Sequence, residues 1–159
     1  MKETPLDPTH IMDVGMGFFA SRTLLTAVEL ELFTELGAHH MTGAQIQEAL
    51  GLHPRAIPDF PDALVALGIL NREGDGPDAV YHNTAESAVF LDKESPNYIG
   101  GILEMAGERL YGFWGHLSEA LKTGQPQNEI KESGEPVFAK LYSAPERLEQ
   151  FMNCLLYTS

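Results

Sequence analysis

Histidine, cysteine and carboxylate side chains are the usual carriers of proton transfer and metal binding. This sequence has six histidines, one cysteine and 23 acidic residues. His39 and His40 are adjacent in an expected loop, where neighbouring side chains do not easily converge on one ion, and the sequence has no cysteine pair and no His-Glu-x-x-His motif. We therefore predict no metal site.

Residues suited to acid–base or nucleophilic catalysis are also isolated. His116 could act as a base, although a packed or surface histidine is the more frequent case. The carboxylate pairs Glu29 with Glu31 and Asp59 with Asp62 are typical of solvated faces or helix starts. The sequence has no Walker lysine loop, Gly-x-Ser-x-Gly motif or Cys-x-x-Cys motif. We nominate no catalytic residue in this chain.

Two glycine pairs are the only candidates for a cofactor loop. A nucleotide-type cofactor is usually held by a strand, a glycine-rich turn and a helix whose N-terminal amides face the ligand. Gly100 and Gly101 instead fall inside an expected helix, and Gly15 and Gly17 precede no helix start. Both pairs are typical of close helix packing, so the sequence predicts no cofactor site of this kind.

The composition limits the partners. A net charge of −13 would repel a phosphate backbone or an anionic membrane surface, so nucleic acid is not expected as a partner. A membrane is not expected either, because the longest nearly continuous apolar run, Ala63 to Leu70, is much shorter than the roughly 20 residues that span a bilayer. The single Cys154 is compatible with a reducing cytoplasm, which is the predicted location.

The elements that would position any site begin with helices whose ends are marked. Apolar residues at helical spacing near the N-terminus predict a first helix that is broken near Glu29 and stops at Gly37. Thr42 stands three residues before Gln45, a capping-box pattern, and predicts a short helix that ends at Gly51.

A second short helix and a hairpin are expected next. Pro54 suits a first helical turn, but Pro58 and Pro61 place the regular part of this helix after about Asp59. The turn-rich residues 74–77, between two short apolar runs, predict a β-hairpin. A helix-turn-helix followed by a hairpin is a winged helix. The predicted fold class is therefore mainly α, a winged helix-turn-helix with a short β-hairpin wing and long flanking helices.

The strongest periodic signal predicts one long helix from about Pro96 to Thr123, closed by Gly124. Its apolar positions cover more than one face, as do those of residues 18–25, and a small winged helix cannot bury both. We infer a partner surface, most simply that of a homodimer. The alternative is that these helices pack on each other within one chain.

The order of these segments resembles one protein family. The segments are Met41-Thr42-Gly43-Ala44-Gln45-Ile46, Gly51-Leu52-His53-Pro54-Arg55, Asp59-Phe60 and Asp62-Ala63-Leu64-Val65-Ala66-Leu67-Gly68-Ile69-Leu70, flanked by Phe18-Phe19-Ala20-Ser21-Arg22-Thr23-Leu24-Leu25 and Phe113-Trp114-Gly115-His116-Leu117. Together they resemble the N-terminal winged-helix dimerisation domain of bacterial and plant-type small-molecule O-methyltransferases, the group that includes acetylserotonin and caffeic acid methyltransferase relatives.

The resemblance implies a homodimer of interlocked N-terminal domains that close one side of an acceptor pocket. It also implies a Rossmann-like domain, outside this chain, that binds S-adenosylmethionine and methylates a small aromatic or polyketide hydroxyl. By position in the family pattern, Met105 and Phe138 would line the acceptor pocket and Phe151 would lie near the methyl donor. Ordinary core packing is the alternative for all three.

The same pattern places four residues at the dimer interface or in the core: Phe18, Phe19, Leu24 and Trp114. The implied organisation is a winged-helix dimerisation domain over 9–95, and a long helix and linker toward the cofactor domain over 96–153. Residues 154–159 depart from the family pattern and are typical of a non-native tail. The chain is then expected to be a fragment that neither methylates nor binds S-adenosylmethionine alone.

Two other classes of protein stay open. One is a winged-helix transcription regulator, because fold does not fix function. The stretch from His53 to Thr84 argues against it, since Arg55 and Arg72 are outnumbered there by five acidic residues, whereas a DNA-reading surface is basic. The other is a stand-alone dimerisation or ligand-binding module.

Overall fold

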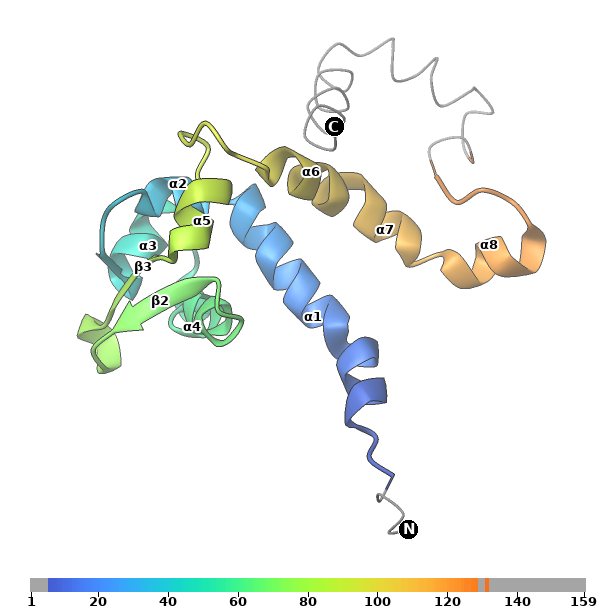
Figure 1. The fold of residues 1–159 in the computed structure, drawn as a ribbon, viewed down its shortest axis with the longest axis horizontal. Coiled ribbons are helices and arrows are strands. Elements are labelled where there is room, and N and C mark those ends of the chain that lie inside the picture. Colours follow the sequence, from blue (N-terminus) through green and yellow to red (C-terminus); the bar gives the residue numbers. More distant parts are fainter. Residues whose placement is uncertain (1–5, 129–130, 132–159) are drawn as a thin grey trace.

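The computed structural model describes residues 6–128 and 131. The described chain is mainly helical, with one small three-stranded sheet. A compact lobe contains the sheet and four short helices, and a first arm, helix α1 (Thr9–Glu29), extends away from it (Figure 1). A second helical arm lies on the other side of α1 and is made by α6 (Gly100–Met105), α7 (Tyr111–Trp114) and α8 (Leu117–Thr123).

The predicted break and end of the first helix are confirmed. Helix α1 (Thr9–Glu29) is followed by Glu31 in the left-handed region, with φ of 58°, and then by the short helix α2 (Leu32–Leu36). Gly37 ends α2 with φ of 48°, a conformation that is open to glycine because it has no Cβ. The turn at Glu31 directs α2 into the lobe.

The predicted capping box is also confirmed. Strand β1 (Met41–Thr42) leads into helix α3 (Gly43–Ala49). The Gln45 amide donates to the Thr42 hydroxyl at 3.3 Å, and the Thr42 amide donates to the Gln45 side-chain oxygen at 2.8 Å. Two amides that the first helical turn leaves without a partner are satisfied in this way.

The prolines act as the sequence predicted. Pro54 opens a short 3-10 turn, η1 (Pro54–Ala56), and the regular helix α4 (Asp59–Ala66) begins directly after Pro58. Pro61 lies in the first turn of α4, where its missing N–H costs no helical hydrogen bond.

The sheet has one more strand than predicted. Strand β2 (Leu70–Glu73) pairs antiparallel with β3 (Val80–Asn83), and the connection contains the 3-10 turn η2 (Gly76–Asp78). The two-residue strand β1 pairs with the other edge of β3, so the strand order is β1-β3-β2. Two residues are too short to show the alternation that identifies a strand in sequence.

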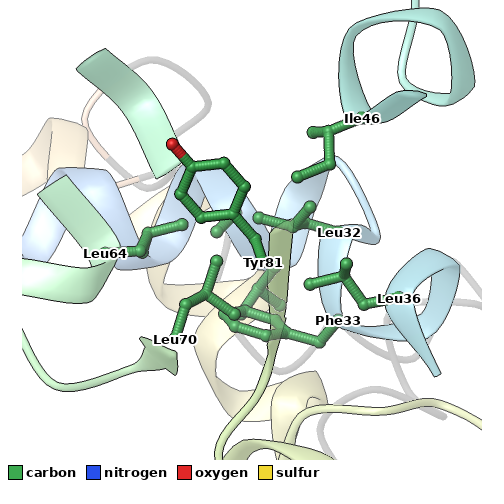
Figure 2. Close-up of a cluster of buried hydrophobic side chains, with 9 residues drawn as sticks. Leu32, Phe33, Leu36, Ile46, Leu64, Leu70 and Tyr81 are labelled. Atoms are coloured by element: carbon green, nitrogen blue, oxygen red, sulfur yellow. The ribbon is translucent and has the colours of Figure 1, made fainter. Parts of the chain in front are cut away.

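The core lies between the sheet and helices α1 to α4. Figure 2 shows its largest buried side chains: Leu32, Phe33, Leu36, Ile46, Leu64, Leu70 and Tyr81. Burial of an aliphatic or aromatic side chain stabilises the fold by about 1.5–3 kcal/mol relative to exposure. The Tyr81 ring lies among the aliphatic side chains, and its hydroxyl points out of the cluster.

Helix α5 (Ala85–Phe90) closes the lobe. Thr84 caps it by accepting a hydrogen bond from the Ser87 amide at 3.1 Å. The Ser87 side chain is buried and donates to the Ile69 carbonyl at 2.6 Å, which ties α5 to the start of the hairpin.

The prediction of one uninterrupted helix over 96–123 is wrong. The helix α6 (Gly100–Met105) starts four residues later, then continues through a π-helical turn, η3 (Ala106–Leu110), into α7 (Tyr111–Trp114). A break at residues 115–116 separates α7 from α8 (Leu117–Thr123). Glycines at 112 and 115 lower helix propensity there by about 1 kcal/mol each. Gly124 ends α8 with φ of 67°, as predicted.

Candidate dimerisation surface and neighbouring sites

The N-terminal half of α1 exposes large apolar residues: Ile11, Met12, Val14, Met16, Phe18 and Phe19. Only Leu25, Ala27 and Val28, near its C-terminal end, are buried. A helix with apolar residues on several sides is stable in water only when another surface covers them. Within the described residues, no surface covers the apolar side chains on the N-terminal half of α1.

The second arm also exposes large apolar residues. Its exposed apolar residues are Ile102, Leu110, Trp114, Leu117 and Leu121. The second arm and α1 lie side by side near the lobe (Figure 1), and the described residues leave apolar side chains of both uncovered.

The second arm packs against α1 through specific contacts. Helix α1 contacts α6 and η3, and an added Cβ on Gly107 would lie 3.5 Å from the Leu25 Cβ, which is a close helix approach. The Arg22 guanidinium lies over the Tyr111 ring, 5.7 Å from its centroid, and the Tyr111 hydroxyl donates to the Phe18 carbonyl at 3.2 Å. Helix α1 and the second arm thus do pack on each other around Arg22, Gly107 and Tyr111. This packing does not cover the exposed apolar residues elsewhere on α1 and on the arm.

The four predicted interface residues fall into two groups. Phe18, Phe19 and Trp114 are exposed, by 49%, 59% and 67%, and the rings of Phe18 and Phe19 contact each other with centroids 4.2 Å apart. Leu24 is half-buried and packs against the core cluster. Leu24 thus contacts the core of its own chain, the three aromatic side chains are exposed, and the assignment of all four to a dimer interface stays a prediction.

Met105 is the one predicted pocket residue that the structure describes. It is half-buried at the end of α6. Phe138 and Phe151 lie outside the described residues, so their convergence with Met105 stays a prediction.

A pocket of about 220 Å³ opens between α1 and the start of the second arm, and four of its lining residues are glutamates: Glu29, Glu31, Glu104 and Glu108. The Lys93 ammonium compensates two of them, lying 2.7 Å from Glu31 and 2.9 Å from Glu104. Desolvation alone would lower the pKa of Lys93, but the hydrogen bonds to the two carboxylates outweigh it and raise the pKa. Burial and a hydrogen bond to Glu104 raise the pKa of Tyr98. The pocket is acidic and suits a cation better than an anion.

A second pocket, of about 460 Å³, lies between α3, the segment 54–58 and the hairpin, and Arg72, Tyr81 and Ile57 are among its lining residues. Asp62 accepts a hydrogen bond from the Tyr81 hydroxyl at 2.8 Å and from Arg72 at 3.3 Å. Asp62 lies in the first turn of α4, so the prediction of a helix start is confirmed, and its carboxylate is paired there with Arg72 and Tyr81. Burial, and then the hydrogen bond to Asp62, raise the pKa of Tyr81 to about 12.

The histidines give one unexpected arrangement. His116 is largely exposed, and its Nδ1 lies 4.0 Å from a carboxylate oxygen of Glu119. His40, Glu73 and His82, in contrast, come together, with one potential metal-binding atom of each within 4.8 Å of the others. Their separation in the chain conforms to no short motif, and only the pairing of β1, β2 and β3 brings them to one place.

Helix α1 also changes the expectation about membranes. Among the described helices, it alone is long and apolar enough to cross a bilayer by length and composition, and 17% of that stretch is buried. The prediction relied on the length of uninterrupted apolar runs. That argument does not hold for α1, because its apolar stretches are interrupted by a few polar residues but are long enough in sum. One such helix is weak evidence for a membrane, because a helix that packs against another protein has the same composition.

Comparisons with known proteins give this arrangement a context. Residues 12–93 match the family model described as the O-methyltransferase dimerisation domain. The tetracenomycin polyketide synthesis 8-O-methyl transferase TcmO of Streptomyces glaucescens is 38% identical over 148 residues, which are 93% of this chain and 42% of that protein. The N,N-dimethyltransferase OxyT of Streptomyces rimosus is 31% identical over 157 residues, 96% of this chain and 44% of that protein.

A solved structure agrees with these relatives. Human N-acetylserotonin methyltransferase in complex with SAM superimposes with a TM-score of 0.82 and 27% identity, over 99% of this chain and 47% of that one. The architecture described above is thus that of the N-terminal part of these methyltransferases. The chain belongs to the O-methyltransferase dimerisation domain family, and it spans less than half the length of the relatives it matches.

Proposed function

We propose that this chain is the dimerisation and acceptor-side part of an S-adenosylmethionine-dependent O-methyltransferase that acts on a small aromatic or polyketide hydroxyl. The observation that carries the proposal is the row of exposed apolar residues on α1 and the second arm, in a chain that belongs to a dimerisation family. The name of TcmO supports a polyketide acceptor, and that of OxyT shows that a similar chain also serves an N-methyltransferase.

The proposed organisation follows the sequence prediction. A winged-helix dimerisation domain occupies 9–95, with α3 and α4 as the helix-turn-helix and β2–β3 as the wing. Residues 96–153 lead toward a methyl-donor domain outside this chain, and 154–159 form a non-native tail. We expect the protein to work in the cytoplasm, where the methyl donor is made available to biosynthetic enzymes.

The homodimer is tested by light scattering of the chain after gel filtration. We expect a mass of twice 17.5 kDa. Phe19→Asp should shift the protein to the monomer, because a carboxylate at a covered apolar position is costly to desolvate. The control is Leu67→Asp, at the residue that caps the C-terminal end of α4 and is 41% exposed, which should leave the dimer intact. A parent chain that is monomeric at tens of micromolar would refute the proposal.

The assignment of the methyl-donor site is tested separately. Calorimetric titration of the chain with S-adenosylmethionine should give no binding, since the site is proposed to lie outside residues 1–159. Binding with a one-to-one ratio would show that the chain itself holds the cofactor. The acceptor role of Met105 is tested in the complete enzyme, where Met105→Ala should raise the KM for the acceptor more than the KM for the donor.

The competing class is a DNA-binding regulator with the same helix-turn-helix and hairpin. The charges of the lobe argue against it, because the Arg72 guanidinium lies against Asp62 and over the Tyr81 ring. An arginine held in this way cannot reach a phosphate or a base edge without breaking these contacts. Tight and salt-sensitive binding of duplex DNA in a mobility-shift assay would favour the DNA-binding regulator over the methyltransferase.

A further inference from the structure

Two histidines and a glutamate lie on the face of the sheet opposite the core. Within β3, Tyr81 is buried in the core, so the next residue, His82, projects from the other face. Asn71 of β2 pairs with His82, and Glu73, two residues along the same strand, shares that face. The β1–β3 register, continued back by one residue, sets His40 beside His82. Their rings stack with centroids 4.3 Å apart and 8° between the planes.

The backbone fixes the orientation of His82. Its Nδ1 lies 3.1 Å from the carbonyl oxygen of Asn83, and because that oxygen can only accept, Nδ1 carries the hydrogen. The other ring nitrogen, Nε2, then faces Oε1 of Glu73 at 3.3 Å. A neutral imidazole would direct a lone pair at a carboxylate there, which is unfavourable unless a proton or a metal cation lies between them. A hydrogen bond from the second nitrogen to a carbonyl is also what orients metal-binding histidines.

The third side chain completes a plausible donor set. Nδ1 of His40 lies 3.9 Å from Oε2 of Glu73, and one donor atom of each of the three residues lies within 4.8 Å of the others. Tetrahedral zinc ligands, at about 2.0–2.2 Å from the ion, are separated from each other by about 3.3 Å. We propose that His40, Glu73 and His82 bind a divalent transition-metal ion of the zinc class, with the fourth position open to water or to a further ligand.

The properties of the three residues fit this proposal. His82 is held by its strand and its hydrogen bond and has a side chain only 22% exposed, so it supplies a fixed ligand. His40 is half-exposed and can tilt out of the stack to direct its nitrogen at the ion. Two nitrogen donors to one carboxylate favour zinc-class ions over calcium and magnesium, which prefer oxygen. The net charge of −13 favours a cation over an anion.

The experiment is calorimetric titration of the tag-free, chelator-treated chain with zinc chloride in a buffer that does not bind zinc. All variants carry Cys154→Ser, so that the only thiol cannot contribute. We expect one ion per chain and an affinity that falls by about tenfold or more in His40→Ala, Glu73→Gln and His82→Ala. His39→Ala, which removes the adjacent histidine, and His116→Ala, which removes a histidine near one glutamate, should bind as the parent does.

A second measurement separates loss of a ligand from loss of folding. Circular dichroism of each apo variant should match the apo parent, and zinc should raise the Tm of the parent and of His39→Ala but not that of Glu73→Gln. Cobalt added in place of zinc should give the visible absorption of a tetrahedral site in the parent, His39→Ala and His116→Ala, but not in His40→Ala, Glu73→Gln or His82→Ala. Absence of binding at 100-fold molar excess of zinc, or binding that survives Glu73→Gln and His82→Ala unchanged, would overturn the proposal.

Discussion

Tyr81 has its ring in the core and its hydroxyl on Asp62, and this position makes it sensitive to alkali. Its folded pKa of about 12 lies above the ordinary value of 10.0. The native state therefore holds the phenolic proton where the unfolded chain would release it. The stability from this group is complete below pH 10 and is lost as the pH rises from 10 to 12.

We expect the free energy of unfolding to fall with pH in this window more steeply in the parent than in Tyr81→Phe, which has no proton to lose. The difference between the two should change by about 2–3 kcal/mol across the window. Urea unfolding at a series of pH values measures it. Parallel pH profiles for the parent and the variant would show that Tyr81 ionises as freely as an exposed tyrosine.

Asn83 is a second residue whose role depends on hydrogen bonds to residues distant in the sequence. Its side-chain amide donates to the carbonyls of Phe33 at 2.8 Å and Gly37 at 3.1 Å, and so satisfies the end of α2 from strand β3.

We expect Asn83→Asp to destabilise the chain by about 1–3 kcal/mol, because a carboxylate cannot donate and would face two carbonyl oxygens. Asn97→Asp, at an exposed position, is the control and should change stability by less than about 0.5 kcal/mol. Thermal unfolding of both variants decides the matter. Equal Tm values would mean that the two hydrogen bonds contribute nothing.

At the scale of elements, short helices depend on their ends more than on their length. Helix α3 has seven residues, too few to be stable alone, and it begins at the capping box of Thr42 and Gln45. The same residue, Thr42, also belongs to β1, so the cap connects a helix to the sheet.

We therefore expect Thr42→Ala to cost about 1 kcal/mol of stability. The matched substitution Thr123→Ala, at the exposed end of α8, should cost less because no packed element depends on it. Chemical denaturation compares the two midpoints. A larger loss of stability from Thr123→Ala would show that the exposed end of α8 contributes more to stability than the capping box of α3.

The arm formed by α6, η3, α7 and α8 shows where periodicity misleads. Apolar spacing continues through residues 99–121 as if the helix were continuous, but the structure breaks it at residues 115–116. Periodicity reports which side chains share a face, whereas glycines decide whether the backbone continues. The break sets a different direction for α8 and hence a different surface for any partner.

At the scale of the whole molecule, the exposed apolar sides of α1 and the second arm are the dominant feature. Trp114 is the only tryptophan and is 67% exposed in the single chain. If the proposed dimer covers it, its fluorescence should move to shorter wavelength as the protein concentration rises through the dimer dissociation constant.

The measurement is tryptophan emission over a dilution series, with the monomeric variant Phe19→Asp as the control. We expect the emission of the variant to be that of an exposed indole at every concentration. An exposed-type emission in the parent as well, while light scattering reports a dimer, would place the interface elsewhere on the molecule.

The sequence alone determined most of the elements, although not β1 or the breaks in the second arm, and it determined which family the chain belongs to. Caps, prolines and glycines act on their immediate neighbours, so Gly37, Thr42, Pro54 and Gly124 marked their elements correctly. The family follows from the order of such marked segments along the chain, and the match of residues 12–93 to the family model confirms it.

Only the tertiary structure decided which distant side chains meet. His40, Glu73 and His82 share a face because two strand pairings align them, and the hydroxyl of Tyr81 finds Asp62 because α4 packs on the hairpin. Strand register and helix packing are set by the burial of the whole core, which no local pattern encodes. A sequence reading can thus name the elements of this chain, but the sites between those elements exist only once the core has formed.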